Sequence, residues 1–312
     1  MITTDLDRFL ALARACAPDF GPATARAAFL VTPEGFARAE ESAQDNRYMA
    51  AAGYHAEAAL AEHRALQRAL SADVPVFAFP GDPATPDAVF PNNVFAIARP
   101  DAQVLPQAPP RLLVGRMRHA VRQAEAARAD IRGFFRDTAG AVEIDLSQQP
   151  HPCELTGSLV IDRARGLGFC GLSERCDEAG AALMHEAFGL RATLLFDLAA
   201  GEYHTNVVLA VLAGRAVLVS PAGFAEPAVA QAIAGLYALH AVLLERRQQA
   251  AFAANAIALS PRRVWMSAVA AASLDPARVQ ALARAGFELG QVPLAAIEAG
   301  GGSLRCCVAE VF

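Results

Sequence analysis

Residues 154–196, ELTGSLVIDRARGLGFCGLSERCDEAGAALMHEAFGLRATLLF, contain the pattern that decides the fold. Apolar runs at 155–162 and 168–172 predict a β-hairpin. A helix is expected over 177–188, with Asp177 as its N-cap, and a further strand over 192–196. Two strands, a helix and a strand in this order predict a ββαβ unit and therefore an α/β fold.

The same alternation extends over most of the chain. Further strands are predicted at 74–79, 93–98, 112–114, 142–146, 204–211, 216–220, 242–245, 255–259 and 304–311. Further helices are predicted at 116–136, 226–239 and 275–285, the last capped by Asp275 with Pro276 at its first position. The spacing suggests repeated ββαβ units of about 60 residues, although no self-similarity of sequence proves a repeat.

Composition excludes several classes of protein. The chain has 312 residues, 54% hydrophobic and 19% charged, which is enough apolar material for a sizeable core and excludes global disorder. Its net charge of −5 gives no support for binding nucleic acid or an anionic membrane. Residues 1–17 lack the apolar core of a signal peptide, and the most hydrophobic stretch, 228–244, is shorter than a membrane span. The six cysteines form no CxxC pair, which favours reduced thiols and the cytoplasm.

The segment GGGSLRCC at 300–307 is the most unusual in the chain. Three glycines allow a ligand to approach the backbone, and cysteines follow at the start of an apolar run. Strand alternation predicts that one of Cys306 and Cys307 faces a site and the other the core. The alternative is a flexible turn leading into a buried strand with small apolar cysteines.

Three further segments place polar side chains before apolar strands. His204 is a candidate general acid or base, and Asn206 lies two residues further on the same face. Glu154 is a candidate for binding an amino or amidino group. The alternatives are a rim histidine bonded to the backbone and a solvated loop acid. Asn93, in FPNN at 90–93, stands where asparagine is usually a turn residue.

Taken together, these segments resemble one known superfamily. They are FPNN (90–93), ELTGSLVIDR (154–163), LSERCD (172–177), YHTNVV (203–208), FAANAIAL (252–259) and GGGSLRC (300–306). In this order they resemble the amidinotransferase-like, guanidino-group-modifying superfamily, which includes arginine deiminases, dimethylarginine dimethylaminohydrolases and glycine amidinotransferases. The greatest likeness is to the citrulline-utilisation hydrolases, from about Phe29 to the C-terminus. The resemblance implies a five-bladed α/β propeller, or pentein, as one domain over 1–312, with 1–27 as an N-terminal helical extension.

The resemblance also implies roles for particular residues. Cys306 matches the family's nucleophile, His204 its general acid/base, and Glu154 the carboxylate that holds the substrate and orients the histidine. Asn93 and Asn206 stand where deiminases have aspartates. Thr32, Val94 and Ala254 replace an arginine, a tryptophan and a glycine that are frequent in relatives.

The substrate expected from these residues is a small ureido or guanidino amino acid. Because an asparagine side chain is neutral and both donates and accepts hydrogen bonds, Asn93 and Asn206 suit the neutral ureido group of citrulline better than a cationic guanidinium. Cleavage with release of the alkylamine gives ornithine. The alternatives are an arginine deiminase, a dimethylarginine-type hydrolase, an amidinotransferase and a non-catalytic binding protein.

Recognition of the substrate's carboxylate has three candidate residues. Arg163, Arg175 and Arg305 are candidates, and each is more often a structural arginine. No metal or organic cofactor is expected, because thiolate attack on a carbon bonded to nitrogens needs none. No partner other than the small substrate is implied, and the oligomeric state is left open.

Overall fold

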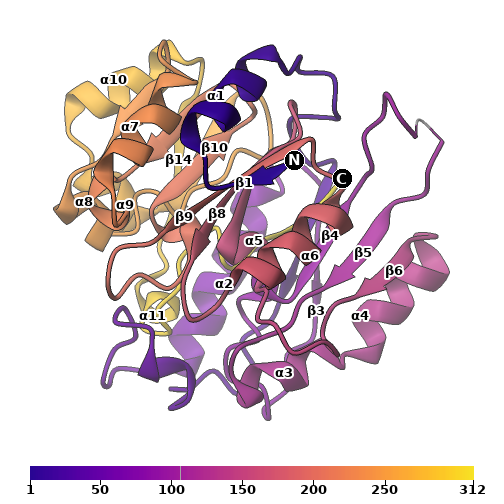
Figure 1. The fold of residues 1–312 in the computed structure, drawn as a ribbon. Coiled ribbons are helices and arrows are strands. Elements are labelled where there is room, and N and C mark those ends of the chain that lie inside the picture. Colours follow the sequence, from indigo (N-terminus) through magenta and orange to yellow (C-terminus); the bar gives the residue numbers. More distant parts are fainter. Residues whose placement is uncertain (106) are drawn as a thin grey trace.

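The computed structural model describes residues 1–105 and 107–312 (Figure 1). In it the expected ββαβ unit is present. Strand β7 (Leu159–Asp162) pairs antiparallel with β8 (Leu167–Leu172), and β8 pairs parallel with β9 (Ala192–Asp197). Helix α6 (Glu178–Phe188) connects β8 to β9.

The ends of α6 follow from its sequence. The Asp177 carboxylate accepts a hydrogen bond from the Gly180 backbone N–H at 2.7 Å, which confirms the predicted N-cap. Gly189 ends the helix with a φ of 66°, a left-handed conformation that glycine adopts without strain. The cap predicted at Asp275 is also present, with its carboxylate accepting from the Arg278 backbone N–H at 3.0 Å.

One antiparallel pairing followed by one parallel pairing recurs along the chain. It is found in β4 (Phe95–Ala98), β5 (Arg111–Val114) and β6 (Val142–Asp145), and in β10 (Leu209–Leu212), β11 (Ala216–Val219) and β12 (Ala241–Leu243). It is also found in β15 (Ala309–Val311), β2 (Ala27–Val31) and β3 (Val76–Phe79), which joins the two ends of the chain in one sheet. In the remaining case β13 (Arg263–Ser267) pairs parallel with β14 (Glu288–Val292), and a single bridge from Ile257 to Trp265 stands in for the first strand.

The described strands therefore form an α/β structure of mixed sheets. There are four sheets, of six, four, three and two strands. No closed barrel is formed by the strands that the structure describes, so the five-bladed propeller stays a prediction.

Several predicted strands begin later than expected, and the difference concerns the site. Residues Pro91–Asn93 and Thr205–Val207 are 3₁₀ turns, and Leu155–Ser158 is one helical turn, α5. The final strand begins only at Ala309, so residues 304–307 form a turn. The argument from strand alternation for Cys306 and Cys307 is therefore wrong, because neither residue lies in a strand.

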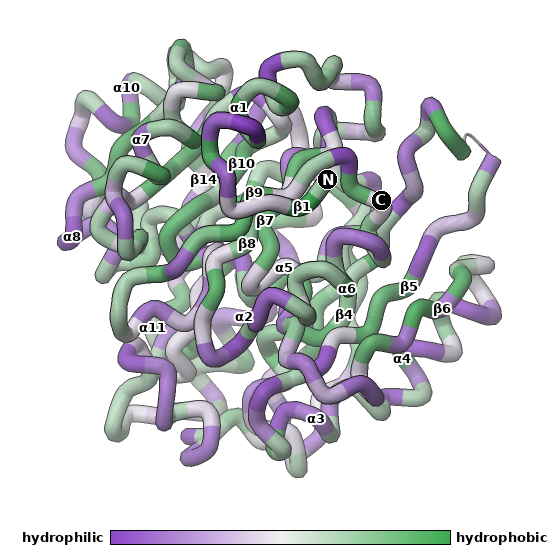
Figure 2. The backbone as a smooth tube through the Cα atoms, viewed as in Figure 1, coloured by the Kyte–Doolittle hydropathy of each residue, from purple (hydrophilic) through white to green (hydrophobic). Residues whose placement is uncertain are grey.

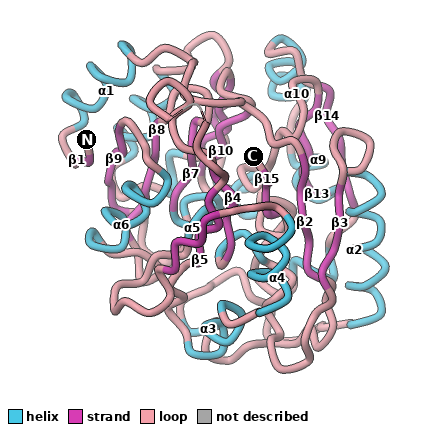
Figure 3. Tube along the Cα trace, turned by 90° about the vertical axis from the view of Figure 1, so that its right-hand side faces the viewer, coloured by secondary structure: helices cyan, strands magenta, loops and turns pink. Residues whose placement is uncertain are grey.

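Other differences have local causes. The helix predicted over 116–136 is divided into α3 (Ala120–Ala126), α4 (Ala129–Gly133) and a π-helical turn, Phe134–Thr138. The break falls at Arg128, which has a ψ of 95° and whose guanidinium binds Asp130 and the Pro80 carbonyl. The sequence analysis did not predict β2, β13, β14 or the long helix α2 (Ala56–Leu70), which Figure 3 shows beside β3.

The N-terminal segment is part of a sheet. Strand β1 (Ile2–Thr3) pairs parallel with β9, and α1 (Leu6–Ala15) follows it. Phe9 of α1 is fully buried, and its ring lies edge-on to Phe169 of β8, with centroids 5.6 Å apart. Residues 1–27 thus contain the expected helix together with a strand that extends the β7–β9 sheet.

Helices surround the strands. In Figure 1, α7 (Pro227–Gly235), α9 (Ala268–Ser273) and α10 (Pro276–Arg284) gather on one side, and α3 and α4 on the other. The short helices α8 (Arg246–Ala250) and α11 (Ala295–Glu298) complete the list. In Figure 2 strand β5 is mainly hydrophobic, whereas the chain around α3 is mainly hydrophilic.

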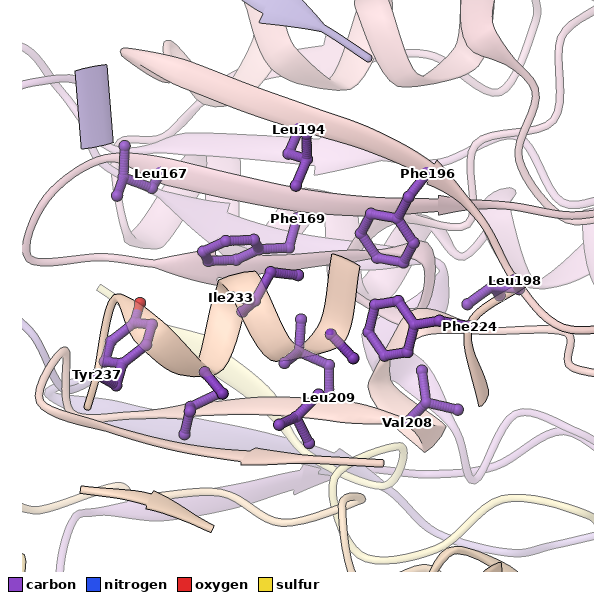
Figure 4. Close-up of a cluster of buried hydrophobic side chains, with 14 of the residues drawn as sticks. Leu167, Phe169, Leu194, Phe196, Leu198, Val208, Leu209, Phe224, Ile233 and Tyr237 are labelled. Atoms are coloured by element: carbon purple, nitrogen blue, oxygen red, sulfur yellow. The ribbon is translucent and has the colours of Figure 1, made fainter. Parts of the chain in front are cut away.

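One cluster of the core shows how the layers meet. Phe196 of β9 stacks on Phe224, with ring centroids 4.7 Å apart, and Ile233 of α7 lies beside the Phe169 ring in the same cluster (Figure 4). Burial of such side chains contributes roughly 1.5–3 kcal/mol each. Among the helices described, none combines the length and the apolarity needed to cross a bilayer.

Candidate active site

Five turns of the chain lie close together and carry the residues of the candidate site. Each turn precedes the first strand, or the bridge, of one repeat of the pairing pattern. The residues that these turns carry are Asn93, Glu154, His204, Asn255 and Cys306, all at most 3% exposed. The repeated topology thus brings together residues that lie more than 200 positions apart in the sequence.

Glu154 and His204 form a buried pair. The His204 Nε2 atom lies 2.8 Å from the Glu154 Oε2 atom, and both side chains are 0% exposed. An ionised carboxylate accepts hydrogen bonds only, so Nε2 carries the proton and Nδ1 offers a lone pair. Burial lowers the pKa of His204, against the opposing effect of Glu154, so the imidazole is neutral near pH 7.

Both oxygens of Glu154 already have partners. Oε1 accepts from the Arg118 backbone N–H at 3.0 Å, and the Arg175 guanidinium lies 3.3 Å from Oε2. Burial alone raises the pKa of the Glu154 carboxyl, but Arg175 and His204 outweigh it and hold that pKa well below its ordinary value. The carboxylate is therefore ionised and orients His204.

Asn255 fixes the position of Cys306. Its Nδ2 atom donates to the Cys306 Sγ atom at 3.3 Å, and its Oδ1 atom accepts from the Cys306 backbone N–H at 3.3 Å. The thiol also lies 3.8 Å from the Oδ1 atom of Asn206. Burial raises the pKa of the Cys306 thiol, although hydrogen bonds from Ser303 and Asn255 oppose this, so the free protein holds a thiol near neutral pH.

A cavity lies beside Cys306, and its space, including the part open to solvent, is about 270 Å³. Its lining residues are Ser42, Asn46, Met49, Asp87, Phe90, Asn93, Arg122, Arg175, Tyr203, Gly300, Gly302 and Cys306. The glycines at 300 and 302 lie against the Phe90 ring, where a Cβ atom on Gly302 would lie 2.8 Å from it.

Beside Gly157, two buried polar atoms have no hydrogen-bond partner among the described residues. They are Oδ1 of Asn93 and Nδ1 of His204. Both face Gly157, because a Cβ atom there would lie 2.6 Å from the first and 2.9 Å from the second. An unpartnered buried polar atom costs roughly 1–3 kcal/mol, which a ligand can recover by hydrogen bonding.

The structure brings together only part of the predicted site. Asn93 and Cys306 line the cavity, and Glu154 and His204 adjoin it through Gly157.

Asn206 and Arg305 lie elsewhere. The Nδ2 atom of Asn206 donates to the Thr156 carbonyl at 3.2 Å, and its Oδ1 atom faces Asn255 and Cys306. Arg305 donates to the Val308 carbonyl and to Glu310, away from the cavity. Neither side chain is directed toward a substrate in the cavity beside Cys306.

The sequence analysis missed two charged residues of the cavity. Asp87 has one carboxylate oxygen without a partner among the described residues, and its other oxygen accepts from Ser42 at 2.6 Å. Arg122 donates to Glu125 at 2.8 Å and to the Phe90 carbonyl at 3.1 Å. No local pattern distinguishes these two from surface residues. The polar run FPNN was the nearest signal, since Asp87 stands three residues before it.

Arg175 was named among candidates for a substrate carboxylate, and it does line the cavity. Its guanidinium also binds Asp45 at 2.5 Å, the Ser42 carbonyl and Glu154. No group of three or more His, Cys, Asp or Glu residues within 1–105 and 107–312 is arranged to hold a metal ion.

A cysteine, a histidine and a carboxylate thus lie buried in a mixed α/β fold. The family model described as "N,N dimethylarginine dimethylhydrolase, eukaryotic" matches residues 32–312. The chain belongs to this family, and the resemblance to the superfamily is confirmed. It is accordingly a hydrolase of C–N bonds other than peptide bonds, with a cysteine nucleophile.

Solved structures support the fold. The N-terminal domain of ArgZ, an arginine dihydrolase from Cyanobacteria, is similar with a TM-score of 0.77 and 18% identity, covering 91% of this chain and 97% of that one. Unliganded AgrE has a TM-score of 0.76 and 17% identity, over 92% of this chain and 39% of that one. A dimethylarginine dimethylaminohydrolase bound to a chloropyridine has a TM-score of 0.66 and 19% identity, over 92% and 99%. The curated proteins contain no match.

The first prediction concerns the protonation of Cys306. Because burial raises the pKa of this thiol, alkylation by iodoacetamide is expected to be slow at pH 7 and to accelerate with pH beyond the ordinary cysteine pKa. Removing the Asn255 amide in Asn255→Ala moves this rise to still higher pH. The measurement is peptide mass spectrometry, with Cys306→Ser as background. Full reactivity at pH 7 would contradict this picture.

The second prediction concerns Gly157. In Gly157→Ala the new methyl group lies against Asn93 Oδ1 and His204 Nδ1, and we expect kcat/KM to fall at least about tenfold through the displaced groups. The alkylation profile of Cys306 stays as in the wild type, since Gly157 does not contact the thiol. A shift of that profile, or unchanged turnover, would show that the space beside Gly157 is not used.

Proposed function

We propose that this protein hydrolyses the ureido group of citrulline to give ornithine, through a covalent intermediate on Cys306. His204 is the general acid and base, Glu154 orients it, and Asn93 contacts the ureido group. The proposal is supported by one observation above others. The free protein holds a neutral imidazole beside a protonated thiol, and the reacting end of the cavity presents a neutral amide.

The number of available protons suits a neutral substrate. Attack by the Cys306 sulfur requires loss of its proton, and the departing alkylamine requires one proton. The Nδ1 atom of His204 accepts the proton of the thiol through its lone pair. It then donates this proton to the leaving nitrogen. Compared with a ureido group, a guanidinium carries one more proton and a positive charge. Deiminases bind this charge with carboxylates. Here Asn93 occupies such a position, and both oxygens of Glu154 have partners.

The steps balance as follows. The Cys306 sulfur attacks the ureido carbon, and the tetrahedral intermediate collapses with cleavage of the bond to the side-chain nitrogen. This releases ornithine and leaves a carbamoyl group on sulfur. His204 then takes a proton from water, whose oxygen attacks the carbamoyl carbon, and the proton returns to the sulfur. The product, carbamic acid, decomposes to ammonia and carbon dioxide.

The far end of the cavity suits an α-amino acid. Asp87 offers one unpartnered carboxylate oxygen for an ammonium group, and Arg122 and Arg175 line the same cavity for a carboxylate. Burial raises the pKa of Asp87, although Arg122 opposes this, so a bound cation favours its ionised form. The zwitterionic end of citrulline thus has a partner for each of its charges.

The second candidate is hydrolysis of arginine or a methylated arginine. The observation that favours it is the same Asp87 carboxylate, the only acidic residue among those described in the lining, if it faces a guanidinium instead. The family name and the arginine dihydrolase among the similar structures point the same way. Ureido and guanidino substrates differ in the product formed, so turnover distinguishes them.

The proposal includes the organisation of the chain. Residues 1–312 act as one α/β propeller domain of five ββαβ units, with 1–27 as an N-terminal extension, in the cytoplasm and without a metal or organic cofactor. The support for five units is the pairing pattern that recurs in the sheets, with one repeat having a bridge in place of its first strand.

The third prediction is the product formed. Purified protein given L-citrulline is expected to release ornithine and ammonia, measured by amino-acid chromatography. Cys306→Ser loses this activity by about a thousandfold or more. Cys16→Ser, a matched change at a cysteine outside the site, keeps it. Faster release of citrulline from L-arginine would contradict the proposal and establish a deiminase.

A further inference from the structure

A second and larger cavity lies on the other side of Asn206. Its space, including the part open to solvent, is about 540 Å³, and it is lined by residues of β7, β10, the 256–258 segment and β15. These are the first strands, or their equivalent, of four repeats, so the cavity runs between the repeats. Small side chains such as Ala210 and Ala256 form part of its wall, but the lining as a whole is more polar than apolar.

Arg163 is the unusual member of this wall. It is 9% exposed, and no residue in the described ranges accepts a hydrogen bond from its guanidinium. The guanidinium lies over the rings of Phe312 and Phe188, with its Cζ atom 4.4 and 5.1 Å from their centroids. Aromatic rings on its faces hold the group in place while leaving its N–H edge available.

The net charge of the cavity is positive. Arg305 and Glu310 also line it and pair with each other at 2.9 Å, so their charges cancel. One positive charge, that of Arg163, is left without a counter-charge in contact with it. Burial lowers the pKa of Arg163 to about 10, and this value leaves the group protonated near pH 7.

We propose that this cavity is a second binding site, separate from the substrate cavity, which takes a small monocarboxylate on the Arg163 guanidinium. The guanidinium edge matches the two oxygens of a carboxylate. A single negative charge neutralises the site, whereas a dianion such as phosphate exceeds its charge.

The second cavity is separated from Cys306 by the side chain of Asn206. Thr156 and Asn206 line this cavity, and Asn206 Oδ1 lies 3.8 Å from the Cys306 sulfur. A carboxylate bound to Arg163 therefore occupies the opposite side of Asn206 from the substrate. The binding claim does not depend on which substrate the enzyme hydrolyses.

The fourth prediction tests this site with butanoate as the probe and titration calorimetry as the measurement. Wild-type protein is expected to bind butanoate saturably, while butanamide, which lacks the charge, does not bind. Arg163→Gln weakens binding at least about tenfold, since it removes the charged donor. Arg163→Lys keeps a charge and retains part of the affinity, which separates lost recognition from lost folding.

Two controls assign the binding to this cavity. Protein alkylated on Cys306 by iodoacetamide, with its substrate cavity blocked, is expected to bind butanoate as before. Arg99 lines a neighbouring groove together with Arg163, but it does not line the cavity. The substitution Arg99→Gln is therefore expected to leave the affinity for butanoate unchanged. Loss of binding on alkylation, equal weakening in Arg99→Gln, unchanged affinity in Arg163→Gln, or no saturable binding would each overturn the proposal.

Discussion

The site depends on one fully buried carboxylate, that of Glu154. A buried charge is stable only when paired and hydrogen-bonded, and loss of one partner of such a pair typically costs about 3–5 kcal/mol. Glu154 meets this requirement through Arg175, the Arg118 backbone and His204. Arg175 in turn binds Asp45, in the segment over the substrate cavity. Turns from different repeats are thereby held in one arrangement, and the tautomer of His204 is fixed.

In the free protein, the groups proposed to act on the bond that breaks are therefore nearly neutral. Glu154 is ionised but has no free oxygen for a substrate, whereas His204 is neutral and has a free nitrogen. In the proposed mechanism, the proton of the Cys306 thiol moves to that nitrogen during attack. Among the charged groups that line the cavity, Asp87 keeps one carboxylate oxygen without a partner in the described residues, whereas Arg175 already binds Asp45 and Glu154. The chemistry proposed for a ureido group follows from this separation.

Some of the regular elements follow from local rules, whereas β2, β13, β14, α2 and the turns of the site were not predicted. The caps at Asp177 and Asp275 and the hairpin of β7 and β8 follow from local rules, and they are present. The starts of the strands near Asn93 and His204 do not follow from such rules. Side chains far away in the sequence hold these turns, as when Thr205 donates to the Ser158 carbonyl and accepts from Gly171.

The residues of the candidate site also divide into those that the sequence indicated and those that only the fold reveals. Cys306, His204, Glu154 and Asn93 were singled out because they stand in distinctive segments, and the structure brings all four to one region. Asp87 belongs to an ordinary stretch of sequence, and only the fold places its carboxylate in the cavity. Asn206 was expected on the face of His204 because a strand was expected there. The 3₁₀ turn instead directs its amide to Thr156 and Asn255.

The most direct test of the central claim is to observe the group that the substrate leaves on the enzyme. Protein mixed with L-citrulline is quenched in acid within the first turnovers, digested and analysed by mass spectrometry. The account predicts a carbamoyl group on the peptide that contains Cys306, and none on the same peptide from Cys306→Ser. An amidino group formed from L-arginine, with no adduct from citrulline, would contradict it.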